Sequence, residues 1–246
     1  MIDKTSTNKA RALYYGLLSK LLVYSTATDR FAGVDDALAI IGTNPLDDHS
    51  GAAAQRLLLV LDTHGTEALT QEYDALFHAF VGKVIRTSAS YYDEGIEAGK
   101  KLVEVRGFIA KTKIRRNEAT FKDNEDTLPF LLSFMHELVE LSSAGHKEYD
   151  TIQHCLFEQI INPFVDDVIE GLFNHDKSDA YKEVAILLNA FMEFERLYFE
   201  VPKLPKKEAK KTKQELADEQ EMQRRAANKA KRDAQSSACE SGACGM

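Results

Sequence analysis

The chain has 246 residues, of which 44% are hydrophobic and 28% charged, as in a soluble globular protein with one large domain and at most an appendage. Residues 1–202 hold 20 Lys and Arg against 32 Asp and Glu, whereas residues 203–246 hold 11 against 7. A body with a net charge of −12 argues against nucleic-acid binding, because it would repel phosphates. Three cysteines, no signal peptide and no run of about 20 apolar residues indicate a cytoplasmic protein without stable membrane insertion.

Apolar residues at spacings of three or four predict helices along the first half of the chain. The first covers residues 10–24, with a stripe made of Leu13, Leu17, Leu21 and Tyr24. Two more are expected over 52–61 and 66–80, the second with a stripe made of Leu69, Tyr73, Leu76, Phe77 and Phe80. A fourth is expected over 91–114, although residues 103–108 within it also fit a strand; its apolar positions include Ile96, Val103 and Ile109.

The second half of the chain has clearer helix signals. Asp126 or Thr127 can cap a helix with Pro129 in its first turn, whose buried face is expected to hold Leu128, Leu131, Leu132, Met135, Leu138 and Val139. This helix should end within residues 142–145. The next carries an apolar series that Pro163 should kink or split, made of Ile152, Leu156, Ile160, Phe164, Val168 and Leu172. A last amphipathic helix is expected over 181–199.

Strand-like alternation is almost absent, so the predicted fold class is all-α, with a single helical bundle over residues 1–202. Residues 203–246 are rich in Lys, Glu, Gln and Ala but have no apolar stripe, which predicts a frayed helix or a disordered linker. This tail ends with Cys239 and Cys244, whose thiols can form a disulfide or hold a soft metal. Two ligands do not complete a tetrahedral metal site, so no firm metal site is predicted.

The sequence lacks the usual catalytic motifs. It has no Walker phosphate loop, no G-x-G-x-x-G after a strand, no H-E-x-x-H and no G-x-S-x-G, so we do not expect an enzyme. No two of the seven histidines are spaced as a helical metal pair would be. Cys155 lies beside the apolar stripe of its helix and is expected to be a small core residue.

Residues 77–92 predict a helix–loop–helix corner. One helix is expected to end near Gly82, a loop with small hydroxyl residues follows, and Ser90 can cap a helix that opens with Tyr91 and Tyr92. A corner rich in aromatic and hydroxyl groups can bind an extended or helical peptide. Its aromatic side chains can also simply pack into the core.

Three stretches carry a family pattern. Residues 73–92 are similar to Y-x-x-L-F, a glycine and P-Y-x-S-x-Y, through Tyr73, Leu76, Phe77, Gly82, Ser90 and Tyr92. Residues 125–135 are similar to E-x-D-H-L-x-x-E-L-x-F-M, and residues 157–164 to F-x-x-x-H-L-x-P-W. In their order and spacing, these stretches resemble the TorD/DmsD family of molybdoenzyme maturation chaperones.

The resemblance implies an all-α chaperone rather than an enzyme. Family members bind the twin-arginine leader of a cytoplasmic precursor and hold the apoprotein until its molybdopterin cofactor is inserted. No cofactor of the chaperone itself is implied, although some members bind guanine nucleotide weakly. The partner would be the catalytic subunit of a molybdoenzyme such as formate dehydrogenase, nitrate reductase or a sulfoxide or N-oxide reductase. The predicted leader-binding residues are Tyr73, Phe77, Ser90, Tyr91, Tyr92, Asp126 and Thr127.

Two other functions remain open at this stage. Cys239 and Cys244 could make the protein a carrier of metal or sulfur, or an enzyme that uses these thiols. The segment Lys203–Lys213, with six lysines and one glutamate, could attach the protein to an anionic membrane or to RNA. Asp126 also has two readings, since it can cap its helix or pair with a leader arginine.

Overall fold

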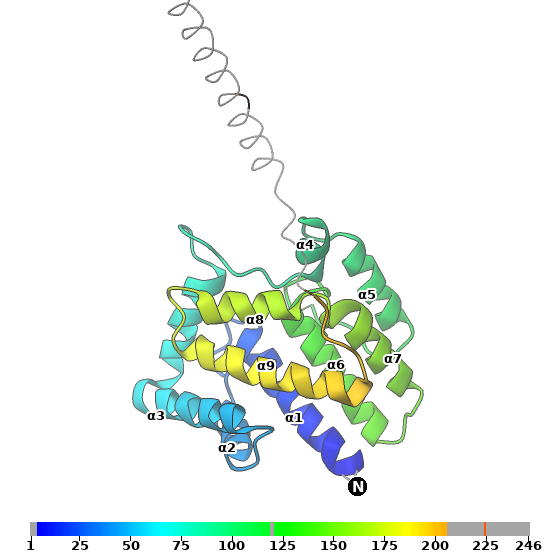
Figure 1. Ribbon diagram of the computed structural model, residues 1–246, viewed down its shortest axis with the longest axis horizontal. Helices are drawn as coiled ribbons and strands as arrows, with labels where there is room; N and C mark the ends of the chain where they lie inside the picture. The colour runs from blue at the N-terminus through cyan, green and yellow to red at the C-terminus, as the bar shows by residue number, and fades with distance from the viewer. Residues whose placement is uncertain (1–3, 119–120, 206–223, 225–246) are drawn as a thin grey trace, which may run out of the picture. The chain divides into compact units, whose positions relative to one another are not determined.

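A computed structural model of the chain describes residues 4–118, 121–205 and 224 (Figure 1). In this part of the chain all regular structure is helical, which confirms the predicted all-α class. Residues up to Leu204 form one folded unit. Nearly all of the predicted tail over 203–246, with Cys239 and Cys244, lies outside the described residues.

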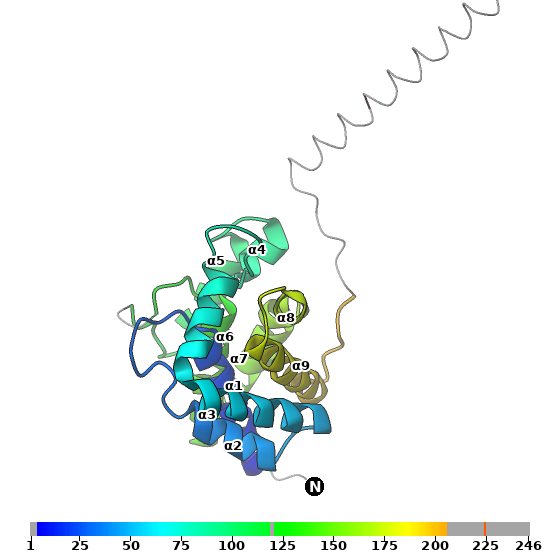
Figure 2. The same cartoon turned by 90° about the vertical axis from the view of Figure 1, so that its left-hand side faces the viewer.

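Nine α-helices and one π-helical turn lie within the described ranges. In chain order they are α1 (Lys4–Leu22), α2 (Val34–Thr43), α3 (Asp48–Phe77), α4 (Ala89–Glu94), α5 (Lys100–Ala110), α6 (Leu128–Ser143), α7 (Tyr149–Leu156), the π-helical η1 (Phe157–Ile161), α8 (Val165–Asn174) and α9 (Ala180–Phe199). Helix α1 packs along α6, α3 packs on α2 and α9, and α8 packs on α9. Helices α4 and α5 lie at one edge of the bundle, as both views show (Figures 1 and 2).

The first half of the chain departs from the predicted boundaries in several places. Helix α2 was not predicted, although its acidic first turn and buried Val34, Leu38 and Ile41 are typical of a helix start and an apolar face. The helices expected over 52–61 and 66–80 are joined as α3, which is broken at Gly65, where φ is 69°. A glycine tolerates this left-handed conformation without a side-chain clash.

Helix α3 ends at Phe77, so the predicted stripe is wrong at its last position. Phe80 and the following Val81 are fully or almost fully exposed. Gly82 follows them with a φ of 105°, a conformation that stops any helix. The loop between α3 and α4 therefore presents two apolar side chains to solvent.

The single helix expected over 91–114 is also wrong, because two helices occupy this range. Helix α4 ends at Gly95, which is left-handed with a φ of 74°, and Ala98 also has a positive φ before α5 begins. The strand reading of residues 103–108 is excluded, since they are helical. Val103 is 70% exposed and Ile96 is exposed as well, so neither belongs to the buried face.

The second half of the chain agrees closely with its predicted pattern. Helix α6 begins after Thr127, has proline in its first turn, and buries all six of the predicted apolar residues. Pro163 separates η1 from α8, as expected for a residue that removes a helical hydrogen bond. Cys155 is only partly buried against the core.

A buried ion pair links the two ends of the folded unit. Arg11 on α1 donates from Nε and Nη2 to the carboxylate of Glu195 on α9, at 2.6 and 2.8 Å. The hydroxyl of Tyr15 donates to the same carboxylate, and Arg11 Nη1 donates to Gln153 on α7. Both charged side chains are almost fully buried, so this network holds three helices in one register.

Candidate functional site

The α3–α4 loop is joined to the segment before α6 by main-chain hydrogen bonds. Leu128 N donates to Thr87 O at 2.8 Å, and Ala89 N donates to Asp126 O at 2.9 Å. Ser88 and Thr127 form an isolated antiparallel bridge. Residues 87–89 and 126–128, about forty positions apart in sequence, therefore form one corner of the molecule.

Asp126 caps a helix other than its own. Its Oδ2 accepts hydrogen bonds from Ser88 Oγ at 2.8 Å and from Ser90 N at 3.0 Å, so it satisfies the first turn of α4. The carboxylate is 0% exposed, and an arginine of a bound peptide does not reach it in this conformation. The expected cap of α4 was Ser90, but the N-cap position is Ser88 and the acceptor comes from the other segment.

Thr127 is the N-cap residue of α6, but its side chain is turned back. Thr127 Oγ1 donates to Asn124 O at 2.9 Å, and no side-chain hydrogen bond caps the helix. Ser90 lies in the first turn of α4 and is fully buried. The polar predicted site residues thus hold the corner together.

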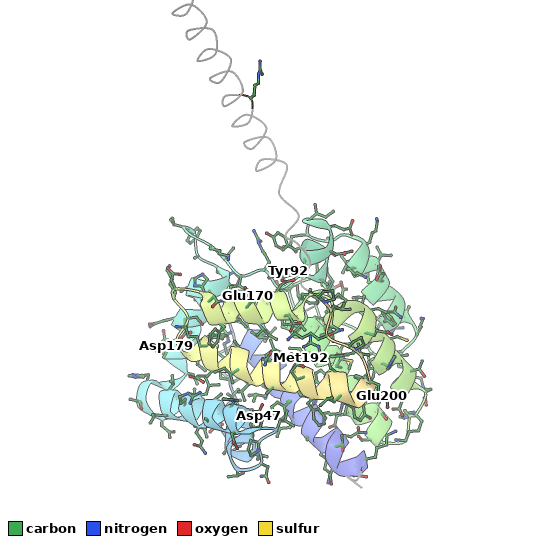
Figure 3. All side chains as sticks on the ribbon, in the orientation of Figure 1. Asp47, Tyr92, Glu170, Asp179, Met192 and Glu200 are labelled. Carbon is green, nitrogen blue, oxygen red and sulfur yellow. The ribbon has the colours of Figure 1, made fainter. Side chains whose placement is uncertain are left out.

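The two tyrosines of α4 have different environments. Tyr92 stacks on Phe164 at the start of α8, with ring centroids 5.7 Å apart, and its hydroxyl donates to Arg86 O (Figure 3). Burial raises the pKa of the Tyr92 phenol well above its usual range, and nearby Asp167 adds to this shift. Tyr91 is 39% exposed and meets Tyr92 edge-on. Tyr91 is therefore the ring of α4 that a ligand can reach.

Tyr73 and Phe77 belong to a second cluster between helices. Their rings lie 4.7 Å apart and contact the ring of Tyr181 on α9. The guanidinium of Arg30 lies 4.5 Å from the centre of the Tyr73 ring. Tyr73 is buried, and burial raises the pKa of its phenol above the usual range. This cluster packs α3 against α9, and only Phe77 is partly accessible.

Tyr91, a predicted site residue, is exposed on α4. Phe80 and Val81 on the α3–α4 loop, which were not predicted as site residues, are exposed as well. Their one signal in the sequence is two large apolar residues directly before Gly82, where a helix should already have ended.

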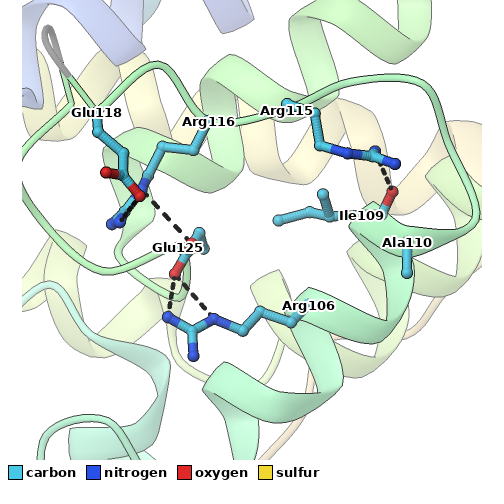
Figure 4. Close-up of a pocket in the computed structure, with 7 residues that line it drawn as sticks. All are labelled: Arg106, Ile109, Ala110, Arg115, Arg116, Glu118 and Glu125. Atoms are coloured by element: carbon cyan, nitrogen blue, oxygen red, sulfur yellow. Dashed lines mark hydrogen bonds and ion pairs between the residues drawn. The ribbon is translucent and has the colours of Figure 1, made fainter.

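A cavity of about 350 Å³ lies beside the corner and was also not predicted (Figure 4). It is lined by Arg106, Ile109, Ala110, Arg115, Arg116, Glu118 and Glu125. Glu125, which directly precedes Asp126, accepts from Arg106 Nε and Nη2 at 3.2 and 3.0 Å. Arg116 Nε lies 3.5 Å from the other carboxylate oxygen of Glu125. The mouth of this cavity thus carries three arginines, two of which hold Glu125.

Features of a metal site or a membrane span are absent from the described ranges. No group of three or more His, Cys, Asp or Glu side chains there could hold a metal ion. None of the helices described combines the length and the apolar character that crossing a membrane requires. The possible ligands Cys239 and Cys244 and the segment Lys203–Lys213 lie wholly or mostly beyond these ranges.

Comparisons with known proteins bear on the same part of the chain. The model of the family described as "Nitrate reductase delta subunit" matches residues 43–170, just over half of the sequence and the whole of the corner. No curated protein sequence matches. A solved structure similar to this one is that of a candidate redox enzyme maturation protein from Archaeoglobus fulgidus, with a TM-score of 0.49 and 20% identity. The match covers 75% of this chain and 93% of that protein.

Proposed function

Because the chain belongs to the nitrate reductase delta subunit family, which is a family of TorD-like chaperones, we propose that it binds the precursor of a molybdenum-containing oxidoreductase through the leader peptide. In this role it assists insertion of the molybdopterin cofactor in the cytoplasm before export. The partner is the catalytic subunit, and the chaperone itself carries out no chemical step.

One observation carries this proposal. Parts of the three stretches with the family pattern, which are far apart in sequence, meet at the corner, whereas Tyr73 and Phe77 lie in a separate cluster against α9. Residues 87–89 hydrogen-bond to residues 126–128, and Tyr92 stacks on Phe164. All three stretches lie inside the matched range 43–170. We infer that a shared pattern which converges on one corner keeps that corner in shape for a common ligand, with Tyr91 as its exposed ring.

We propose different roles in binding for these residues, based on their environments. Tyr91, Phe80 and Val81 are exposed and would contact the hydrophobic stretch of a leader. Phe77 and Tyr92 are partly buried and would border that contact. The buried Tyr73, Ser90, Asp126 and Thr127 would hold the corner in shape rather than touch the peptide. A net charge of −12 over residues 1–202 would attract the basic end of a leader.

Isothermal calorimetry with synthetic leader peptides of the molybdoenzymes of the source genome tests the proposal. We expect one peptide to bind at about micromolar Kd, or about −8 kcal/mol. Tyr91→Ala should weaken this binding by about 1–2 kcal/mol, because an aromatic anchor is lost. Phe173→Ala is the matched control, since Phe173 is an exposed aromatic residue on α8.

Two outcomes would contradict the proposal. If no peptide gives heat, and no catalytic subunit co-purifies with the full-length protein, the chaperone role fails. If a peptide binds but Phe173→Ala weakens it as much as Tyr91→Ala does, the leader site lies elsewhere.

A further inference from the structure

The charges of the folded unit are strongly segregated. The segment Lys100–Arg116, which consists of α5 and the loop after it, holds seven Lys and Arg and one Glu. The remainder of residues 1–202 holds 13 Lys and Arg against 31 Asp and Glu. A segment with a charge of +6 thus lies on a body whose other residues sum to −18. We call residues 100–116 the α5 basic segment.

Most of these charges point to solvent. Lys100, Lys111, Lys113 and Arg115 are exposed, and the side chain of Arg106 is 55% exposed. Three of the seven cations form ion pairs within the described ranges: Lys101 with Glu104, Arg106 with Glu125, and Arg116 with Glu118. Lys111 and Lys113 enter none of these pairs. Lys111 also lies over the ring of Phe108, and Arg115 donates to main-chain carbonyls after α5. Lys100 and Lys113 are exposed, so the segment still presents positive charge to solvent.

The exposed side of α5 includes residues with small side chains. Its buried side packs Leu102, Val105, Phe108 and Ile109 into the bundle, while the exposed side presents Val103, Gly107 and Ala110. Gly107 lies inside the helix without a positive φ, and a Cβ there would meet no atom within 4 Å. The fold thus has no need of a glycine at a position where glycine weakens a helix. Close approach of another backbone would explain it.

We propose that the α5 basic segment is a docking surface for an acidic segment of the client polypeptide, separate from the corner that would bind the leader. This rests on the proposed function and names a second contact with the same client. The backbone of the acidic segment lies over Gly107, and its carboxylates face Lys111, Lys113 and the arginines at the cavity mouth.

The charge distribution favours a compact acidic segment over other anions. Helix α5 has 11 residues and so extends about 16 Å, far more than one phosphate group occupies. A nucleic acid or an anionic membrane extends further than α5 in at least one direction. It would therefore also face the remaining residues of 1–202, whose net charge is −18 and would repel it. A short acidic stretch of protein matches the positive surface without meeting the negative one.

Two charge-reversal variants of equal net charge provide the first test. Lys111→Glu with Lys113→Glu alters the segment, and Lys177→Glu with Lys182→Glu alters two exposed lysines near α8 and α9. With an oligoglutamate peptide as the probe, we expect binding to the wild type that weakens with added salt. The first variant should lose about tenfold in affinity and the second should not. No binding of the peptide, or equal losses in both variants, would overturn the proposal.

Other anions are tested with the same proteins. Pyrophosphate and phosphatidylglycerol vesicles should bind the wild type no better than they bind the variant with Lys111→Glu and Lys113→Glu. If pyrophosphate bound at the arginine cavity more tightly than the peptide did, the segment would instead serve a phosphate-bearing small molecule. Vesicle binding that the first variant abolished would make it a membrane contact. Either result overturns the acidic-protein proposal.

Gly107→Gln separates docking from folding. It should raise the melting temperature, because glutamine favours a helix. It should also weaken peptide binding, because the longer side chain obstructs the close approach of the peptide backbone. Unchanged peptide affinity would reject the close approach over Gly107.

Capture of the client subunit distinguishes the two proposals. If the wild type captures no subunit, the chaperone role fails, whereas equal capture by the wild type and by Lys111→Glu with Lys113→Glu rejects only the second contact.

Discussion

The layer of α1, α6 and α9 and the corner formed by the start of α4 and the segment before α6 are stabilised in different ways. Helix α6 buries every apolar position of its stripe, and α1 and α9 are joined by the Arg11–Glu195 pair. In the corner, α4 has six residues and its first turn is capped by Asp126 from a distant segment. The layer is held by continuous apolar packing, and the corner by a few polar contacts. A surface that must adapt to a client is better built in the second way.

The largest expected effect is in the layer. Glu195→Gln should lower the free energy of unfolding by about 3–5 kcal/mol, because it leaves the buried Arg11 charge uncompensated. Urea denaturation followed by circular dichroism measures this. Glu183→Gln is the control, since it breaks the exposed pair with Arg56 and should cost at most about 1 kcal/mol. Equal losses of stability in Glu195→Gln and Glu183→Gln would mean that the Arg11 network is not buried in solution.

A pair of truncations compares the layer with α5, which lies beside the corner. Leu131→Ala on α6 removes a fully buried side chain and should cost about 2–5 kcal/mol. Val103→Ala on α5 removes an exposed one and should stay within about 0.5 kcal/mol. Thermal melts of the two variants give the difference. A large loss for Val103→Ala would show that α5 packs against something in the isolated protein.

The cap across the corner should have an intermediate effect. Asp126→Ala removes the acceptor of Ser88 Oγ and Ser90 N, and should cost about 1–3 kcal/mol. Amide hydrogen exchange should show faster exchange within α4. Asp47→Ala is the matched control, because Asp47 caps its own helix, α3. In Asp47→Ala the faster exchange should be confined to the first turn of α3. Faster exchange in α4 of this variant would contradict the assignment of Asp126 as the cap of α4.

The smallest expected effects concern two glycines, one at the end of α4 and one in α5. Gly107→Ala should stabilise the protein by about 0.5–1 kcal/mol, because the position is helical and open. Gly95→Ala should destabilise it by about 1 kcal/mol, since Gly95 is left-handed with a φ of 74°. Melting temperatures of the two variants should move in opposite directions. A fall for Gly107→Ala would mean that folding itself requires this glycine.

Prediction of the fold succeeded where apolar periodicity was long. The stripe of residues 128–139, with Pro129 after its cap, gave α6 its correct start and buried face. The split at Pro163 and the last helix were also confirmed. These signals are local, because a side chain three or four positions away lies on the same helix face whatever the rest of the chain does.

Prediction failed where backbone conformation depended on glycine or on distant contacts. Residues 91–114 keep helical spacing across Gly95 and Gly99, but the chain turns there, so Val103 faces solvent. Phe80 continued the pattern of α3 beyond the actual end of that helix. The candidate site shows the same limit. The pattern brought Tyr73 and Tyr92 together as binding residues, but Tyr73 is buried against α9, in another cluster.

An all-helical chain, an acidic body and three stretches with a chaperone pattern can be predicted from the sequence alone. These properties depend on composition and on local spacing. The caps and ion pairs could not be predicted: Asp126 caps α4, and Arg106 and Arg116 hold Glu125. Such contacts join residues far apart in the chain, and their geometry is set by how helices pack, which no local pattern specifies.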